Sequence, residues 1–148
     1  MGETNLDTTL LNQLFHNYST VELVNTERNL AAFANDVYNL TDADGQKYVM
    51  RILKAPIPET VQFEAVMQTM LADGHIGTAQ YLKLSTGGYV GEQNGTFFTL
   101  SKRIQGTVPK TASLELVRNF GVTLARFHSS LEGLVVPRSK MQWFDPAN

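Results

Sequence analysis

The sequence predicts an α+β domain built on one antiparallel sheet of about five strands with a helix inserted after the third. Strand-like segments are separated by turn signals, among them Asp44-Gly45 and Asn94-Gly95, which are typical of β-hairpins. One helical segment interrupts these strands and another follows them. Of the 148 residues, 43% are hydrophobic and 18% are charged, which is enough to bury the core of one domain.

The first half of the chain is expected to form a helix, a strand and a hairpin. Residues 8–18 carry leucines and a phenylalanine at helical spacing, which predicts a short amphipathic helix. Residues 19–27 alternate as a strand, with Leu23 and Asn25 on one face, and residues 29–34 form a loop. Residues 37–41 and 46–53 are the strands of a hairpin, because Asp44-Gly45 supplies the positive φ that its loop needs.

The second half is expected to contain a helix, three strands and a long helix. Pro58 opens the first helix and Gly74 ends it. The strands are predicted at 80–85, 89–91 and 96–104, and Ser113 caps a helix that runs to about Leu131. A break at 105–110 predicts two units, 1–104 and 105–148. The apolar face of the first helix should be Phe63, Val66, Met67, Met70 and Leu71, and that of the last Leu114, Val117, Phe120, Leu124, Phe127 and Leu131.

Composition excludes several classes of function. The formal charge is −2 and no basic run occurs, so a nucleic-acid partner is not expected. The absence of cysteine excludes disulfides and thiolate metal sites, and the three histidines have no metal-ligand spacing, so we expect no metal site. The start of the chain lacks signal-peptide features and no apolar run is long enough to span a bilayer, which predicts a cytoplasmic protein without a membrane partner.

Arg51 and Glu64 are the first candidates for a site. Arg51 shares a strand face with Val49 and Leu53, where a charge needs a partner or a ligand such as a phosphate. The alternatives are an arginine that reaches solvent from an edge strand and a solvated helix glutamate. A strand cation followed by a helix anion is the arrangement that kinases use to hold a phosphate contact. The loop 29–36 lacks glycine, so phosphate binding there would rest on backbone amides and on Asn35.

Five segments in order resemble the aminoglycoside phosphotransferase and choline/homoserine kinase-like family. Residues 34–40 and 44–52 resemble its nucleotide-binding hairpin, and Glu64 fits the glutamate of its inserted helix. Residues 98–106, which end in Ile-Gln-Gly, are similar to its hinge strand, and residues 121–128 resemble its helix that ends in Leu-Ala-x-Leu-His. The resemblance implies a protein-kinase-like amino-terminal lobe, followed by the first helix of an incomplete carboxy-terminal lobe.

The resemblance also implies roles for six residues. Arg51 would bind a phosphate of ATP, and Glu64 would orient it. The backbone of Ser101 and Arg103 would hydrogen-bond the adenine. Leu100 would be the gatekeeper, and the loop around Asn35 would cover the phosphates. The family's acceptors are small molecules with a hydroxyl, such as amino sugars, choline and homoserine.

The sequence departs from the family at the catalytic loop, His-Gly-Asp-x-x-x-x-Asn, because His128 is followed by two serines. No catalytic residue is therefore assigned, the Mg²⁺ ligands of the complete enzyme are expected to be missing, and the chain is expected to be truncated. We carry three hypotheses: an inactive ATP-binding portion of a phosphotransferase, a non-catalytic nucleotide-binding or protein-interaction module, and an unrelated ligand sensor in which Arg51 and Glu64 form a structural pair. A homodimer through the helix at 113–131 would cover its apolar stripe.

Overall fold

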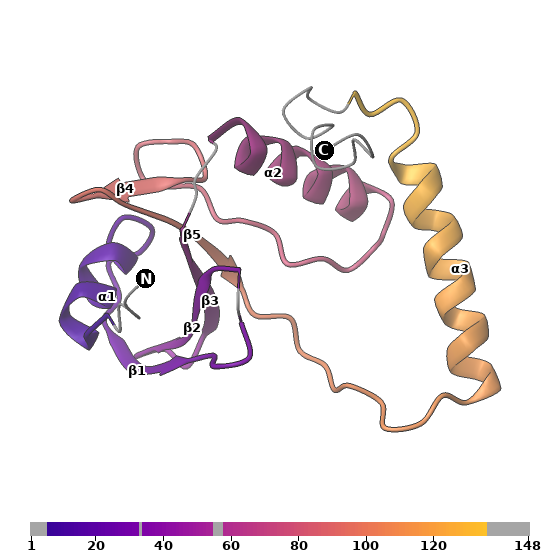
Figure 1. Cartoon of the computed structure of the whole chain (residues 1–148), viewed down its shortest axis with the longest axis horizontal. Coiled ribbons are helices and arrows are strands. Elements are labelled where there is room, and N and C mark those ends of the chain that lie inside the picture. Colours follow the sequence, from indigo (N-terminus) through magenta and orange to yellow (C-terminus); the bar gives the residue numbers. More distant parts are fainter. Residues whose placement is uncertain (1–5, 33, 55–57, 136–148) are drawn as a thin grey trace, which may run out of the picture.

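The computed structural model describes residues 6–32, 34–54 and 58–135, and it confirms the predicted α+β architecture. Five antiparallel strands form one sheet in the order β1-β2-β3-β5-β4, with a helix inserted after the third strand (Figure 1). The elements are α1 (Thr8–Phe15), β1 (Leu23–Arg28), β2 (Asp36–Asp42), β3 (Lys47–Leu53), α2 (Pro58–Asp73), β4 (Gly91–Gln93), β5 (Thr96–Lys102) and α3 (Leu114–Ser130).

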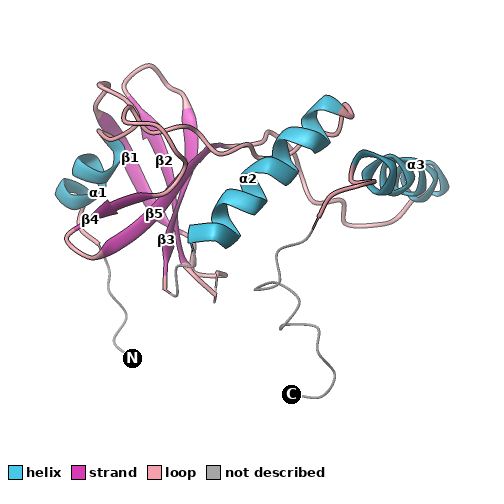
Figure 2. Ribbon diagram, turned by 90° about the horizontal axis from the view of Figure 1, so that it is seen from above, coloured by secondary structure: helices cyan, strands magenta, loops and turns pink. Residues whose placement is uncertain are grey.

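The two faces of the sheet are covered by different helices. Figure 2 shows α1 and α2 on opposite sides of the sheet. Met50 and Leu100 lie on the α1 face, in a core cluster with Leu14 and Phe15 of that helix. The cluster on the α2 face contains Leu53, Val61, Ala65 and Tyr81. β3 is therefore covered on both faces.

The hairpin between β2 and β3 is held by the side chain of Asp42, which is only 2% exposed. Its Oδ1 accepts hydrogen bonds from the backbone N–H of Asp44 (3.1 Å) and of Gln46 (2.8 Å), and its Oδ2 accepts the hydroxyl of Tyr48 at 3.0 Å. Gly45 has the predicted positive φ of 78°. Burial, together with Asp42, raises the pKa of the Tyr48 hydroxyl to about 12.

Three strand predictions need correction, and the simplest is that the short strand expected at 89–91 begins only at Gly91 and runs to Gln93. Residues 80–85 do not form a strand: they contribute one bridge, between Tyr81 and Ser101. The chain then turns away because the N–H of Ser85 donates to the carbonyl of Asn17, beyond the end of α1. In β1 the register shifts between Leu23 and Asn25, so Leu23 is buried while Asn25 is exposed, although strict alternation predicted one face for both.

The buried face of α2 is also different from the predicted one. Val61, Ala65 and Leu71 are buried, and only Leu71 was expected there. Val66, which was predicted to be inside, is 43% exposed. The helix is rotated so that Glu64 reaches Arg51 on the sheet. The spacing of apolar residues predicts which face is hydrophobic, but it does not take this ion pair into account.

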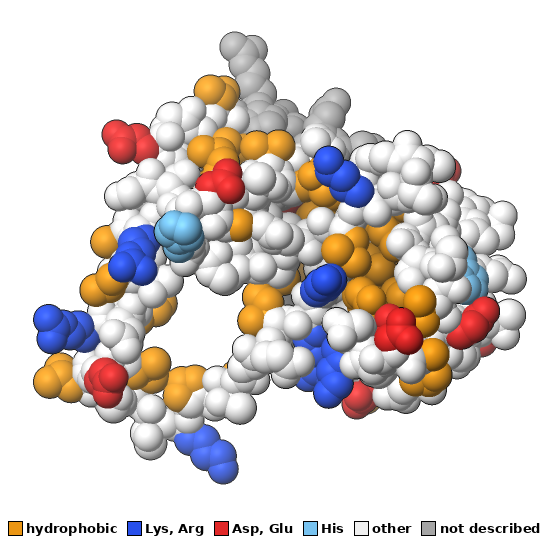
Figure 3. Space-filling view, turned by 180° about the vertical axis from the view of Figure 1, so that it is seen from behind, with side chains coloured by type: hydrophobic (Ala, Val, Ile, Leu, Met, Phe, Trp, Pro, Cys, Tyr) orange, Lys and Arg blue, Asp and Glu red, His pale blue; other side chains and the backbone are white. Residues whose placement is uncertain are grey.

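The α3 helix stands apart from the sheet (Figure 1). Ser113 is its N-cap as predicted, because its hydroxyl accepts the N–H of Leu116 at 3.1 Å. None of the residues of α3 is buried, and Figure 3 shows hydrophobic side chains along its surface. The predicted irregular segment lies outside the described residues from 136 onward. No helix of the described part is long and apolar enough to cross a membrane.

Candidate functional site

Three side chains from distant parts of the chain meet on the α2 face of the sheet. Arg51 on β3 places Nη1 3.3 Å from Oε2 of Glu64 on α2. The hydroxyl of Tyr81 donates to the same Oε2 at 2.7 Å and accepts a hydrogen bond from Nη1 of Arg51. The predicted ion pair is therefore present, and a tyrosine that the sequence analysis did not select closes it into a triangle. We call these three side chains the Arg51 cluster.

Each member of the cluster is fixed by its own element. The alternation of β3 puts Arg51 on the face opposite Met50, as predicted. Tyr81 pairs with Ser101 of β5, and its backbone N–H donates to Oε1 of Gln68, one helical turn after Glu64 on α2. Tyr81 therefore joins β5, α2 and β3 through backbone and side chain together.

The cluster lies at the boundary between core and solvent. The side chains of Arg51 and Glu64 are 32% and 23% exposed, whereas Tyr81 is buried. Burial of the Tyr81 hydroxyl raises its pKa above the ordinary value, and Glu64 adds to this while the charge of Arg51 opposes it. The guanidinium also lies 5.8 Å from the centre of the Tyr81 ring, within the range of a cation–π contact. A neutral tyrosine thus sits between two charges that water still reaches.

Thr99 and Ser101 of β5 share the face of the Arg51 cluster. Thr99 stands directly opposite Arg51 in the β3–β5 register and is 1% exposed. Among the described residues, no group makes a well-formed hydrogen bond with its hydroxyl oxygen, although Thr99 acts on the Tyr81 hydroxyl and lowers its pKa against the effect of burial. Ser101 is opposite Val49 and its hydroxyl donates to the Val49 carbonyl at 3.5 Å. Thr99 is a polar residue beside the cluster that the sequence analysis did not select.

The base of the loop before β2 is held by a second set of charges. Asn35 accepts the backbone N–H of Lys54 through its Oδ1 at 3.3 Å. Asp36 pairs with Arg28 at 2.7 Å and with Nζ of Lys54 at 3.4 Å. Burial raises the pKa of the Asp36 carboxyl, but hydrogen bonds from Arg28 and Lys54 outweigh this and leave it below the usual value. These contacts fix both ends of the loop and the end of β3.

Two of the predicted residues are placed away from the cluster. Leu100 is fully buried on the α1 face, because its register partner is Met50 rather than Arg51. The backbone N–H of Arg103 donates to the carbonyl of Lys47 at 2.9 Å, so in this structure it continues the β3–β5 ladder. Arg103 also lines a cavity of about 370 Å³ between the segment 78–82 and residues 102–104.

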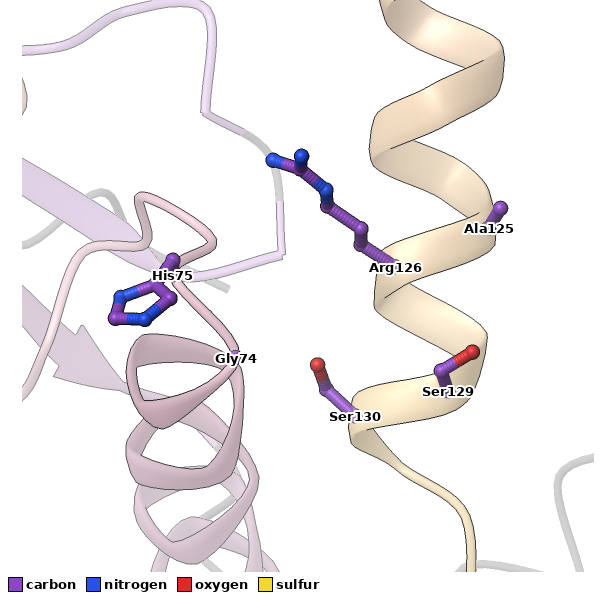
Figure 4. Close-up of a pocket in the computed structure, with 6 residues that line it drawn as sticks. All are labelled: Gly74, His75, Ala125, Arg126, Ser129 and Ser130. Carbon is purple, nitrogen blue, oxygen red and sulfur yellow. The ribbon is translucent and has the colours of Figure 1, made fainter.

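A second cavity, of about 440 Å³, lies where α2 and α3 approach each other (Figure 4). Gly74 and His75 line it from the end of α2, and Arg126, Ser129 and Ser130 line it from α3. A side chain at Gly74 would overlap the side chain of Ser130. In the described part of the chain, no group of three or more histidine, aspartate or glutamate residues is placed to hold a metal ion.

Tyr81 and Thr99 could have been found from the sequence only with the strand register in hand. A tyrosine in an apolar segment is ordinarily a core residue, and a threonine inside a strand is common. Their proximity to Arg51 follows from pairing β5 with both β3 and residue 81, which joins positions 30 and 48 residues apart along the chain.

Comparisons with known proteins concern the fold that carries these side chains. Residues 26–146 match the model of the phosphotransferase enzyme family. Among solved structures, similar folds include an amicoumacin kinase in complex with AMP-PNP, Ca²⁺ and Ami (TM-score 0.69, 16% identity, 90% of this chain and 42% of that one). Spectinomycin phosphotransferase in complex with ADP and spectinomycin is also similar (TM-score 0.66, 14% identity, 91% and 40%).

An aminoglycoside phosphotransferase from Alicyclobacillus acidocaldarius is a third similar structure (TM-score 0.63, 15% identity, 90% and 37%). The chain therefore spans about two fifths of the length of these proteins. At these identities the likeness concerns the fold. A search of curated proteins returned no match.

Proposed function

Since the chain belongs to the phosphotransferase enzyme family, we propose that it is the ATP-binding portion of an enzyme that phosphorylates a hydroxyl group of a small molecule. Its fold is that of the kinase-like amino-terminal lobe, as the resemblance implied. The observation that carries the proposal is the ion pair between Arg51 of β3 and Glu64 of α2. A strand cation held by a glutamate of the inserted helix is the arrangement that positions a phosphate contact in kinases.

The donor set of Arg51 fits a phosphate. The hydrogen bonds found in the described part of the chain use Nη1, and a guanidinium carries five N–H groups in all. The side chain is one-third exposed, so the other donors can face a ligand. Glu64 would hold Nη1 of Arg51 close to α2, and the loop that ends at Asn35 would cover the phosphates from the fixed ends described above.

The adenine would lie at the end of β5, next to Ser101, where Lys102 and Arg103 line the cavity of about 370 Å³. The backbone N–H of Arg103 already donates to the carbonyl of Lys47, so Arg103 would need to exchange that hydrogen bond for one to the adenine. Leu100 would act from the α1 face, by holding this end of β5 in place. ATP supplies the transferred phosphoryl group, and Mg²⁺ in the complete enzyme would neutralise its charge.

The acceptor belongs to the same proposal. The similar structures hold spectinomycin in one case and Ami in another. For this chain we propose a small alcohol, such as an amino sugar, choline or homoserine, and a cytoplasmic location. Because the chain spans only about two fifths of those proteins, we propose that it binds ATP weakly and does not transfer phosphate alone. A non-catalytic nucleotide-binding or protein-interaction module is the alternative, since the same lobe would serve it.

Calorimetric titration of the chain with AMP-PNP tests the proposal, with Arg51→Met and Lys47→Met as matched variants. Lys47 lies on the same strand face but is exposed and four residues away. Loss of a charged hydrogen bond worth about 1.5–3 kcal/mol should weaken AMP-PNP binding roughly tenfold or more in Arg51→Met. Lys47→Met should bind like the parent. Equal affinities of the two variants would contradict the phosphate role of Arg51, and phosphoryl transfer by the chain alone would contradict the need for a further part.

A further inference from the structure

The Arg51 cluster contains a third member whose position is independent of the ion pair. Tyr81 reaches Arg51 and Glu64 with one hydroxyl, and its backbone is tied to Gln68 and to Ser101. The arginine has a flexible side chain that is one-third exposed, and the pair with Glu64 is a single Nη1–Oε2 contact of 3.3 Å. One such contact leaves the guanidinium free to swing about it, so the pair alone does not fix where the other N–H groups point.

We propose that Tyr81 is a positioning residue for nucleotide phosphate: its hydroxyl and ring fix the orientation of the Arg51 guanidinium. This inference rests on the proposed function, because it concerns the same phosphate contact. The hydroxyl provides a second hydrogen bond to Nη1, and the ring lies 5.8 Å from the guanidinium carbon. Two restraints in different directions define the plane of the guanidinium, whereas one defines only a distance.

The buried position of Tyr81 makes this restraint rigid. Its side chain lies in the core cluster with Leu53, Val61 and Ala65, so the ring cannot follow a movement of Arg51. Its hydroxyl donates its one proton to Glu64, which leaves its oxygen free to accept from Arg51. The Tyr81 hydroxyl therefore accepts from the charged arginine and donates to the charged glutamate, so it holds both side chains next to its oxygen.

Binding of three ligands separates positioning from folding. Adenosine carries no phosphate, whereas ADP and AMP-PNP do, and only the phosphate contact depends on Arg51. We expect Tyr81→Phe to weaken the binding of ADP and AMP-PNP about threefold to tenfold and to leave adenosine binding unchanged. Tyr89→Phe is the matched control. Tyr89 packs against the same hydrophobic core cluster as Tyr81, but its ring lies near Lys83 instead of Arg51. Circular dichroism confirms that each variant is folded at the assay temperature.

A second measurement uses the unmodified chain, so that it does not depend on the variant folding. With the tyrosine Cζ carbons labelled with ¹³C, the Tyr81 resonance should shift when AMP-PNP binds and should stay in place with adenosine. The double variant Tyr81→Phe/Arg51→Met should bind AMP-PNP no more weakly than Arg51→Met alone, because the tyrosine acts through the arginine.

The outcomes distinguish the two proposals. If the unmodified chain binds AMP-PNP no better than adenosine, the phosphate role of Arg51 fails, and the positioning role fails with it. If Arg51→Met loses the preference for phosphate while Tyr81→Phe keeps it, the proposed function stands and the positioning role is overturned. Equal loss of adenosine and AMP-PNP in Tyr81→Phe, or an unmoved Tyr81 resonance, would also overturn it, since either indicates a structural tyrosine.

Discussion

Gly91 is the position where the packing of the sheet predicts a large cost for one methyl group. It is the first residue of β4, it is buried, and it stands opposite Phe98 of β5. A Cβ atom at Gly91 would lie 2.5 Å from Cε2 and 2.9 Å from Cε1 of the Phe98 ring. The ring itself is 0% exposed and meets Tyr18 edge-on at a centroid distance of 6.0 Å. The Gly91→Ala substitution therefore requires one of two strands or a core ring to move.

The size of the effect follows from the overlap. Ordinary contacts of this kind begin at 3.4 Å and Cζ of the ring is closer still than Cε2, so the ring must give way by about 1 Å in a closely packed core. Overpacking of this order costs about 1–3 kcal/mol. With a urea m-value of about 1–3 kcal/mol/M, the midpoint of unfolding should fall by roughly 1 M. Gly106→Ala is the control, because a Cβ there meets no atom within 4 Å, and it should leave the midpoint almost unchanged.

Urea unfolding followed by circular dichroism measures both variants, and a double-mutant cycle identifies the contact. Combining Gly91→Ala with Phe98→Leu should cost less than the sum of the single changes, because the smaller side chain makes room for the methyl group. A midpoint for Gly91→Ala within 0.2 M of the parent, or strict additivity with Phe98→Leu, would refute the reasoning, since β4 would then move freely away from the ring.

Three further predictions concern other parts of the molecule. Thr99→Val should leave the free energy of unfolding in urea within about 1 kcal/mol of the parent, because the buried hydroxyl that it removes makes no well-formed hydrogen bond; a larger loss would show that this hydroxyl bonds to Tyr81. Asp36 has a lowered pKa, so its contribution to stability is present above its ordinary pKa and is lost as the pH falls through the lower folded value. The stability gap between the parent and Asp36→Asn should thus narrow in acid, and a constant gap down to about pH 2 would contradict the pairing with Arg28 and Lys54. Finally, the exposed face of α3, with Phe120 66% exposed, should make the chain self-associate in light scattering over a concentration series, and Phe120→Asp should give a monomer; a concentration-independent monomer for the parent would argue against a dimer through α3.

Local chemistry was enough to predict the hairpin and the cap of the last helix. The loop at Asp42 is determined by an aspartate that bonds its own backbone and by a glycine at positive φ, and both are visible in the sequence. Ser113 satisfies N–H groups of its own helix in the same way. Such features depend on residues a few positions apart, so the sequence contains their cause.

Features set by distant contacts were predicted less well. A strand was predicted at 80–85, but the chain leaves the sheet after one bridge, since the N–H of Ser85 bonds to the carbonyl of Asn17. The Arg51–Glu64 pair could be predicted, because a strand cation followed by a helix anion is an arrangement known from kinases. Which residues of β5 share the face of Arg51 could not be predicted. This depends on the β3–β5 register, which places Thr99 opposite Arg51 and Leu100 opposite Met50. A shift of one position along a strand exchanges its faces, and nothing in the sequence of β5 alone fixes that shift.

The Arg51 cluster is built entirely from residues between 51 and 81, and α3 contributes nothing to it. The residues that hold the pair can therefore be inherited as one block, whatever sequence follows β5. An exchange of genetic material between relatives at the exposed stretch 103–112 would transmit the whole cluster intact, whereas a crossover inside 51–81 would separate the arginine from its partners. If Arg51 binds phosphate as proposed, an exchange after β5 would join this phosphate contact to a different acceptor site without rebuilding the Arg51 cluster.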